Sequence, residues 1–302
     1  MSYADREDWK DVQPIPQDDG PNPLVPIAYG NDYREAMDYF RAVMRTEEKS
    51  KRVLELTADI IDMNPAHYTV WQYRQDTLFA INADLRAELE YINEIASEQA
   101  KSYQIWHHRQ VVVDKLGDGS GELAFINAII DEDSKNYHAW SYRQWVVTRF
   151  DYWDKELLYT DDLLVFDVRN NSAWNHRHFV LFNRPGKASA TDIQNEITFA
   201  KNKIALAPNN QSGWTYLHAM LEASEEPFSQ IEPFLRELQE KGVTSPHLWS
   251  MYIDVYENEA KSGRKPINPA AVEYCGELAT RWDPIREKYW HYRRTQLEQL
   301  AH

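Results

Sequence analysis

Apolar residues recur along most of this chain at the spacing of helices that bury one face. The clearest examples, at intervals of three or four residues, are Leu85, Leu89, Ile92 and Ile95, followed by Leu123, Ile126 and Ile130. Such intervals place the apolar side chains on one side of a helix with about 3.6 residues per turn. The pattern therefore predicts a succession of amphipathic helices rather than strands.

Tryptophan marks a repeat within this helical pattern. Seven tryptophans follow one another at gaps of 35, 34, 34, 40, 35 and 41 residues: Trp71, Trp106, Trp140, Trp174, Trp214, Trp249 and Trp290. An arginine stands three positions after each of the first four, at Arg74, Arg109, Arg143 and Arg177. Units of about 34 residues have the length of a tetratricopeptide-type helical hairpin, although the W-x2-L-G-x2-Y signature of that repeat is absent.

Each unit is predicted to hold two antiparallel helices, of which the second begins at the tryptophan motif. Pro65, Pro208 and Pro284 stand six residues before their tryptophans, where proline ends the first helix. One hairpin cannot bury its apolar face alone, so stacked hairpins are expected to form a right-handed superhelical solenoid. We therefore predict an all-α fold with about seven hairpins in a single repeat domain over residues 31–302.

The first 30 residues do not share the repeat. Residues 12–23 contain four prolines, which is too many for a helix. We predict an extended proline-rich arm over residues 1–30 that is either flexible or laid along a partner. A helix from about Asp32 to Arg45 then leads into the repeats.

Composition narrows the classes of function. The formal net charge is -15, and such a chain is a poor ligand for nucleic acid or anionic membrane, because binding phosphates requires lysine and arginine. The single cysteine, Cys275, excludes a disulfide framework and is expected to be a buried small residue. No apolar run approaches a membrane span, and the polar, acidic N-terminus is unlike a secretory signal. We expect a cytoplasmic protein with no nucleic-acid partner and no membrane span.

Self-contained catalytic motifs are absent, and one local cluster stands out instead. The chain has no phosphate-binding P-loop, G-x-S-x-G or H-E-x-x-H motif. Five residues before the tryptophan, three consecutive units carry a base: Lys101, Lys135 and Arg169. Equivalent positions of stacked repeats lie side by side, here beside the N-termini of the second helices. Cations at helix N-termini favour phosphate, and the residues Tyr103, Tyr137 and Asn136 offer further donors.

Each of these patterns also has a purely structural interpretation. Bases in a turn after a helix commonly cap its last carbonyl groups and stay solvated, and spacing alone does not decide between that role and an anion site. A tryptophan in every unit is typical of a core residue. We predict that Arg74 and Arg177 pair with acidic residues of adjacent helices and fix the stacking of the hairpins.

The tryptophan units, which read N-x-x-x-W-N/H-x-R, resemble the repeat of protein prenyltransferase α subunits. The arm from Trp9 to Tyr29 is similar to that of the α subunit shared by farnesyltransferase and type I geranylgeranyltransferase, and the Rab geranylgeranyltransferase α subunit lacks it. The resemblance covers nearly the whole chain and is strongest over residues 9–180. It weakens in later units, where Leu217 and Tyr252 replace the arginine.

The resemblance implies a subunit that is active only with a catalytic β subunit. The β subunit, an α-α barrel, would hold Zn²⁺ and most of the isoprenoid pocket. The heterodimer would transfer a farnesyl or geranylgeranyl group from its diphosphate to the cysteine of a C-terminal C-a-a-X motif, in proteins such as small GTPases. Zinc would lower the pKa of the substrate thiol, and Mg²⁺ would assist departure of diphosphate in the farnesyl case. No metal site is expected in this chain.

The resemblance also assigns residues to roles. Lys101 and Tyr137 are expected to be catalytic, with Lys101 stabilising charge on the leaving diphosphate. The residues expected to bind the isoprenoid diphosphate are Lys101, Tyr103, Asn136 and Tyr137. The residues expected to bind the peptide are Tyr68, Gln104 and His138, with Gln104 at its free carboxylate and Tyr68 at its last residue. Arg109 and Trp140 would support this site, whereas Lys135 and Arg169 are not placed in catalysis.

The alternative is a non-enzymatic helical-repeat scaffold that binds peptides in its concave face. The coincidence of Lys101, Gln104 and Tyr137 with the arm favours the enzyme subunit, because a generic scaffold has no reason to carry them. The two hypotheses also differ in solution. An isolated α subunit should aggregate through a face meant for its partner, whereas a scaffold should be a well-behaved monomer.

Overall fold

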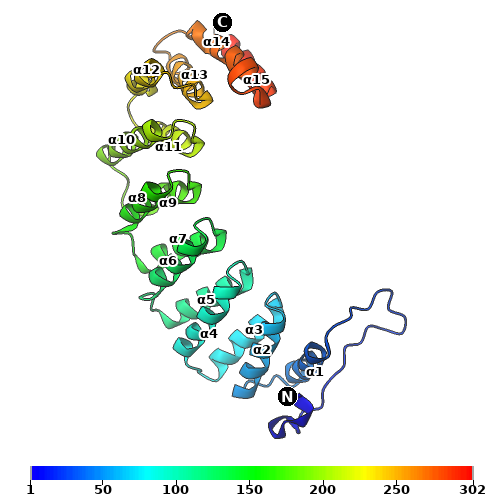
Figure 1. Cartoon of the computed structure of the whole chain (residues 1–302). Helices are drawn as coiled ribbons and strands as arrows, with labels where there is room; N and C mark the ends of the chain where they lie inside the picture. Colours follow the sequence, from blue (N-terminus) through cyan, green and yellow to red (C-terminus); the bar gives the residue numbers. More distant parts are fainter. Residues whose placement is uncertain (1, 301–302) are drawn as a thin grey trace. The chain divides into compact units, whose positions relative to one another are not determined.

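The computed structural model describes residues 2–300, and Met1, Ala301 and His302 lie outside the described residues. No strand occurs among the described residues, which form fifteen α-helices and a few short turns of other helix types (Figure 1). The chain divides into two compact units, Met1–Asp151 and Tyr152–His302, and each is described by itself. The boundaries expected for the arm and for a single repeat domain stay predictions.

Seven helical hairpins follow the leading helix within the described residues, as the tryptophan spacing predicts. Unit 1 contains α1 (Asn31–Thr46), α2 (Lys51–Met63), α3 (Tyr68–Ala80), α4 (Leu85–Glu98), α5 (Tyr103–Leu116), α6 (Glu122–Glu132) and α7 (Tyr137–Phe150). Unit 2 contains α8 (Glu156–Phe166), α9 (Asn171–Asn183), α10 (Ala190–Leu206), α11 (Gln211–Ala223), α12 (Glu232–Glu240), α13 (Pro246–Lys261), α14 (Pro269–Glu277) and α15 (Glu287–Gln299). Each repeat tryptophan lies on the second helix of its hairpin, and the prediction of an all-α repeat fold is confirmed.

The repeat tryptophan closes the turn inside its hairpin. In the first five hairpins the indole is buried, and its Nε1 donates a hydrogen bond to the carbonyl oxygen six residues earlier. In unit 1 the three bonds measure 2.9, 2.8 and 3.0 Å, from Trp71 to Pro65, from Trp106 to Ala100 and from Trp140 to Ser134. In unit 2 they measure 2.9 and 2.8 Å, from Trp174 to Val168 and from Trp214 to Pro208. These five tryptophans are core residues, as predicted, and they fix the geometry of the turn before their helices. Trp249 is only partly buried, and Nε1 of Trp290 donates instead to Oδ2 of Asp283 at 2.8 Å.

The arginine of the motif binds the next hairpin through a buried carboxylate. Arg74 on α3 donates from Nε and Nη2 to the two oxygens of Glu88 on α4, at 2.8 and 2.7 Å. The same two-pronged contact, at 2.6 to 2.8 Å, joins Arg109 to Glu122 and Arg177 to Glu196. Parallel bonds of this kind are the strong form of an arginine–carboxylate pair. The pairing predicted for Arg74 and Arg177 is confirmed.

Each of these carboxylates also accepts a hydrogen bond from a second side chain. It comes from the residue two positions after the next tryptophan, which is either histidine or tyrosine. His108 lies 2.8 Å from Glu88 through Nε2, and the hydroxyl groups of Tyr142 and Tyr216 donate at 2.7 Å to Glu122 and Glu196. Each buried carboxylate is therefore held by two successive second helices, which couples neighbouring hairpins.

The histidine in this series makes stability depend on pH. Burial lowers the pKa of His108 and Glu88 raises it only in part, so the folded protein binds this proton less readily than the unfolded chain, where the pKa is about 6.5. The free energy of unfolding therefore falls as pH drops below about 6.5.

We expect His108→Tyr to lose less thermal stability than the wild type between about pH 7.5 and 5.5, because a phenol does not titrate there. Tyr142 already occupies the equivalent position. The dependence of the melting temperature on pH should become weaker but not vanish, because burial also lowers the pKa of His67 and His178. Melting curves over this range test the prediction against His291→Tyr, a change at an exposed histidine of unit 2. Equal slopes for His108→Tyr and wild type would contradict it.

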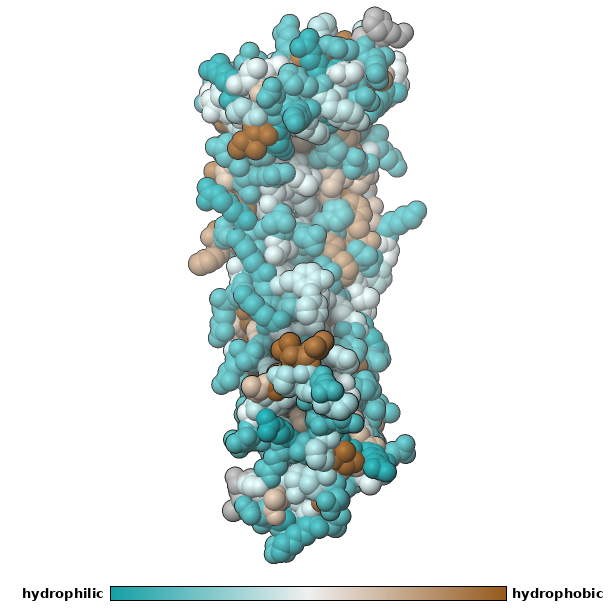
Figure 2. Space-filling model, turned by 90° about the vertical axis from the view of Figure 1, so that its right-hand side faces the viewer, coloured by the Kyte–Doolittle hydropathy of each residue, from teal (hydrophilic) through white to brown (hydrophobic). Residues whose placement is uncertain are grey.

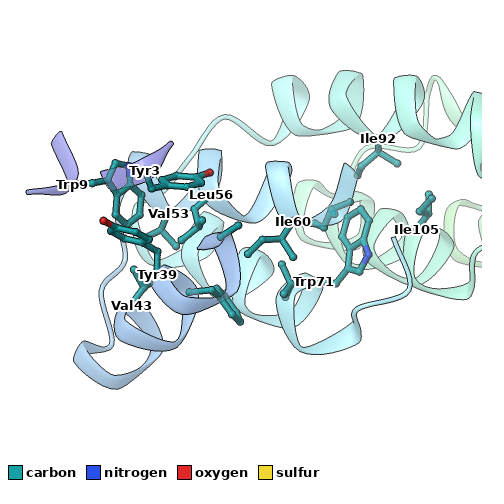
Figure 3. Close-up of a cluster of buried hydrophobic side chains, with 14 of the residues drawn as sticks. Tyr3, Trp9, Tyr39, Val43, Val53, Leu56, Ile60, Trp71, Ile92 and Ile105 are labelled. Carbon is teal, nitrogen blue, oxygen red and sulfur yellow. The ribbon is translucent and has the colours of Figure 1, made fainter. Parts of the chain in front are cut away.

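The first residues of the chain pack on α1 and α2. Two short 3-10 turns place Trp9, which is 1% exposed, edge-on against Tyr3 and Tyr39 with ring centroids 5.3 and 5.5 Å away. The hydroxyl group of Tyr3 donates to the carboxylate of Asp59 on α2. Figure 3 shows the three rings together at one end of a buried cluster that continues to Trp71. They cover the apolar end of the first helices, which would otherwise face water.

Residues 12–30 contain neither helix nor strand. The segment is tied to α1 where the Ile15 amide donates to the Asp38 carbonyl at 3.0 Å, and Leu24 and Val25 are almost fully exposed. The segment projects to the right in Figure 1. Figure 2 views the molecule from that side and shows isolated hydrophobic residues on a largely hydrophilic surface.

Candidate functional site

The candidate site lies at the N-terminal ends of α5 and α7 in unit 1. Tyr103 is the first residue of α5 and Tyr137 the first of α7, and they are 67% and 68% exposed. Tyr68 occupies the same position on α3, one hairpin earlier, and is also exposed. The tryptophan three residues after each tyrosine is buried in the core. The motif thus anchors each second helix while it presents a phenol at its solvent-facing start.

A shallow groove of about 230 Å³ runs between these two helix starts. Its lining is aromatic and polar, and comprises Tyr103, Trp106, His107, Gln110, Tyr137, His138, Ser141 and Tyr142. The His138 ring stands edge-on to Tyr103, with centroids 4.3 Å apart, and lies 5.5 Å from that of Tyr137. Partial burial lowers the pKa of His138, and a hydrogen bond to the backbone of Lys101 opposes that shift.

Lys101 stands in the turn between α4 and α5, beside this groove. Its side chain is 81% exposed, and Nζ lies 3.3 Å from Oδ2 of Asp133, a residue of the turn between α6 and α7. Lys135 is exposed in that same turn, and Arg169 is exposed in the corresponding turn of unit 2. Within residues 2–300 an ion pair is formed by Lys101 but not by the other two bases. The stripe of three cations as a whole stays a prediction.

Asn136 supports the site from within the fold. It is buried, and its Oδ1 caps α7 by accepting from the Ala139 amide at 3.0 Å, while its Nδ2 donates to the Ala100 carbonyl at 3.2 Å. Asn210 makes the equivalent 2.8 Å bond to Val168 in unit 2. This bond belongs to the architecture of the repeat, and near the site it holds the turn that carries Lys101 against α7.

The other predicted residues fall into two groups. Gln104 is half-buried next to Tyr103 and accepts a hydrogen bond from Ser102 at 3.2 Å. Arg109 and Trp140 are buried, where they make the carboxylate and turn contacts described above. The structure thus brings Lys101, Tyr103, Tyr137 and His138 together, with Gln104 adjacent, Tyr68 one hairpin away and the remaining residues beneath them.

Asp133 was missed in the sequence interpretation. A signal for it exists, because aspartate stands seven residues before the tryptophan in two of the three units that carry the basic residue, at Asp133 and Asp167. Spacing alone suggests only a turn residue there, and the contact with Lys101 depends on how two hairpins stack.

The arrangement is suited to holding an anion rather than to supplying a nucleophile. Two phenols stand at the helix N-termini that flank the groove, and the ammonium group of Lys101 lies in the turn just before α5. Groups of all three kinds favour negative charge. Cys275 is buried in unit 2, as expected, and burial raises the pKa of its thiol to about 11. No group of three or more potential metal-ligating side chains occurs among the described residues. In the same part of the chain, no helix has the length and hydropathy to cross a membrane.

Comparisons with known proteins agree with one another. The sequence profile of the protein prenyltransferase alpha subunit repeat matches residues 50–81, 85–116, 120–150, 153–184 and 193–224. The Schizosaccharomyces pombe protein farnesyltransferase/geranylgeranyltransferase type-1 subunit alpha is 57% identical over 220 residues, which are 73% of this chain and 74% of that protein. The subunit of the same name from Dictyostelium discoideum is 38% identical over 305 residues, covering 97% and 93%.

A solved structure gives the same result for the fold. It is described as Candida albicans protein geranylgeranyltransferase-I complexed with GGPP, and the matching chain is 32% identical to this one. The two chains superpose with a TM-score of 0.87, over 97% of this chain and 99% of the other. The likeness therefore extends through both units rather than being confined to the repeats with the strongest motif.

Proposed function

This chain belongs to the family of protein prenyltransferase α subunits, of the kind shared by farnesyltransferase and geranylgeranyltransferase type I, and from this premise we propose how its own residues take part in the reaction. The groove between α5 and α7, with Lys101, binds the diphosphate of the prenyl donor. The observation that carries the proposal is the exposed ammonium beside two exposed phenols at helix N-termini, in a chain of formal net charge -15.

Lys101 and Tyr137 act on the leaving group. The substrate cysteine sulfur bonds to the first carbon of the isoprenoid, and the carbon–oxygen bond to the diphosphate breaks, so that the diphosphate departs with the electron pair. Negative charge on the departing oxygens grows as this bond lengthens. An ammonium and a phenol that donate to those oxygens bind the transition state more strongly than the ground state, which raises kcat.

Gln104 and Tyr68 bind the substrate peptide. Because Gln104 accepts from Ser102 through Oε1, its amide nitrogen stays available to donate to the free C-terminal carboxylate of a C-a-a-X substrate. Tyr68, one hairpin earlier, contacts the last residue of that peptide. His138 packs on Tyr103 and keeps the turn of Lys101 in register with both ends of the site.

The catalytic β subunit completes the enzyme. On the family resemblance we assign Zn²⁺, which would activate the substrate thiol, to the β subunit. Mg²⁺ would assist departure of the diphosphate in the farnesyl case. The scaffold alternative gains no support from a specific observation, since the matches to prenyltransferase subunits cover the arm as well as the repeats.

Prenyl transfer by a reconstituted heterodimer tests this function. The chain is co-expressed with the β subunit of a farnesyltransferase or of a geranylgeranyltransferase type I, and the purified complex is assayed with the matching prenyl diphosphate and a C-a-a-X peptide. We expect transfer by the complex and none by either chain alone. A peptide with serine in place of the acceptor cysteine is the substrate control. A soluble monomer that forms a complex with neither β subunit would contradict the proposal.

A further inference from the structure

The cation proposed to hold the diphosphate already has an anionic partner in this chain. The ammonium of Lys101 lies 3.3 Å from Oδ2 of Asp133, whose side chain is 42% exposed. Asp133 is outside the set of residues that the family resemblance assigns. A carboxylate at this distance from a phosphate-binding lysine competes for the same ammonium, so its presence calls for a functional account.

The carboxylate is held in place by its turn. Its other oxygen, Oδ1, accepts from the Lys135 amide at 3.1 Å. The Asp133 amide donates to the Ile129 carbonyl at 3.0 Å, and its carbonyl accepts from the Asn136 amide at 2.9 Å. Backbone and side chain of Asp133 are thus fixed by three bonds, and Oδ2 is left to face Lys101.

The backbone of Lys101 is held against the same turn. Asn136 donates to the Ala100 carbonyl at 3.2 Å, and the ring of His138 packs edge-on against Tyr103, two residues after Lys101, with centroids 4.3 Å apart. Both ends of the pair therefore have fixed backbones, and the flexible part is the aliphatic stem of the lysine. That stem allows the ammonium to move from a carboxylate to a nearby phosphate without a change in the fold.

We propose that Asp133 is a positioning residue that competes with diphosphate for Lys101. In the empty site it holds the ammonium over the turn between α6 and α7, and it gives the ammonium up when the more highly charged diphosphate arrives. This competition weakens the binding of the prenyl donor and of the diphosphate product alike. The inference rests on the proposed function of Lys101 and deepens it.

Asp133→Asn is the informative variant, because the amide keeps an Oδ1 acceptor for the turn and removes the charge. It is compared with wild type in the heterodimer, with inorganic diphosphate as competitive inhibitor of the prenyl donor. We expect the inhibition constant of diphosphate and the KM for the prenyl donor to fall by roughly 2- to 5-fold, the size expected for an exposed ion pair. The KM for the peptide should not change. Unchanged or weaker diphosphate binding would overturn the proposal.

The matched control is Asp167→Asn. Asp167 makes the same turn bond, to the Arg169 amide at 2.9 Å, in the following repeat. Asp167→Asn should leave the inhibition constant of diphosphate and the KM for the prenyl donor at their wild-type values. A decrease equal to that of Asp133→Asn would refute a specific role for Asp133.

A double-mutant cycle separates this inference from the proposed function. If Asp133 acts through Lys101, Asp133→Asn should change diphosphate inhibition by less than about 2-fold in a Lys101→Ala background. An equal effect in both backgrounds would mean that Asp133 acts on the ligand directly, and would overturn the competition. If Lys101→Ala alone leaves diphosphate inhibition and kcat unchanged, it is the proposed function of Lys101 that fails.

Discussion

Replacing Lys101 with alanine should lower the kcat of the heterodimer by roughly 100- to 1,000-fold, the loss expected when one donor to a developing negative charge is removed. The effect should appear in kcat rather than in the peptide KM, because the charge on the leaving oxygens grows in the transition state. Steady-state transfer to a C-a-a-X peptide measures it. Lys101 is largely exposed and contributes to no buried contact, so the complex should assemble as in the wild type.

Two further variants show whether the loss depends on the position and on the shape of the charge. Lys135→Ala removes the base at the equivalent position of the next repeat, which forms no ion pair within the described residues, and should leave kcat near the wild-type value. Lys101→Arg keeps the charge but spreads it over a planar group, so it should restore activity only in part. A fully active Lys101→Ala complex would keep the family assignment and reduce the basic residues to a structural role.

Glu122→Ala should lower the free energy of unfolding by about 3–5 kcal/mol, which is the usual effect of removing one partner of a buried ion pair. Glu122 and Arg109 are each only 3% exposed, and the carboxylate also accepts from Tyr142. Burial raises the pKa of Tyr142, so its hydroxyl stays protonated and donates. The substitution leaves a guanidinium and a phenol without their acceptor where water has little access.

Denaturant unfolding followed by tryptophan fluorescence measures this loss. The control is Asp114→Ala, which breaks the pair between Asp114 and Arg149, where the side chains are 53% and 48% exposed. That change should cost less than about 1 kcal/mol, because exposed ion pairs contribute little to stability. If Glu122→Ala unfolds with the same free energy as Asp114→Ala, the buried carboxylates do not couple the hairpins.

Several features of this protein follow from its sequence alone. The spacing of Trp71, Trp106 and Trp140, together with the apolar intervals of three and four residues, predicts the hairpins and assigns each tryptophan to a second helix. These features are local, since a helix period and a turn are encoded by residues within one or two turns of each other. The site residues Lys101, Tyr103 and Tyr137 belong to the same local motif, so the turn position of Lys101 and the helix-start positions of the two tyrosines could also be predicted.

Contacts between hairpins required the tertiary structure. A sequence with 48 acidic residues does not reveal which of them meets a given arginine, and Glu122 becomes the partner of Arg109 only when α5 and α6 pack. For the same reason the sequence does not predict that Lys101 pairs with Asp133.

Burial is likewise a property of the packed fold. Asn136 was interpreted from the sequence as a donor to the ligand, and packing made it a buried cap that holds the turn of Lys101. Trp9 lies in the segment that the sequence predicts to be an extended arm. In the structure it is buried, because α1 and α2 supply an apolar surface for it. The repeat period is written in neighbouring residues, whereas the partner of a side chain and its exposure to water depend on residues that only folding brings together.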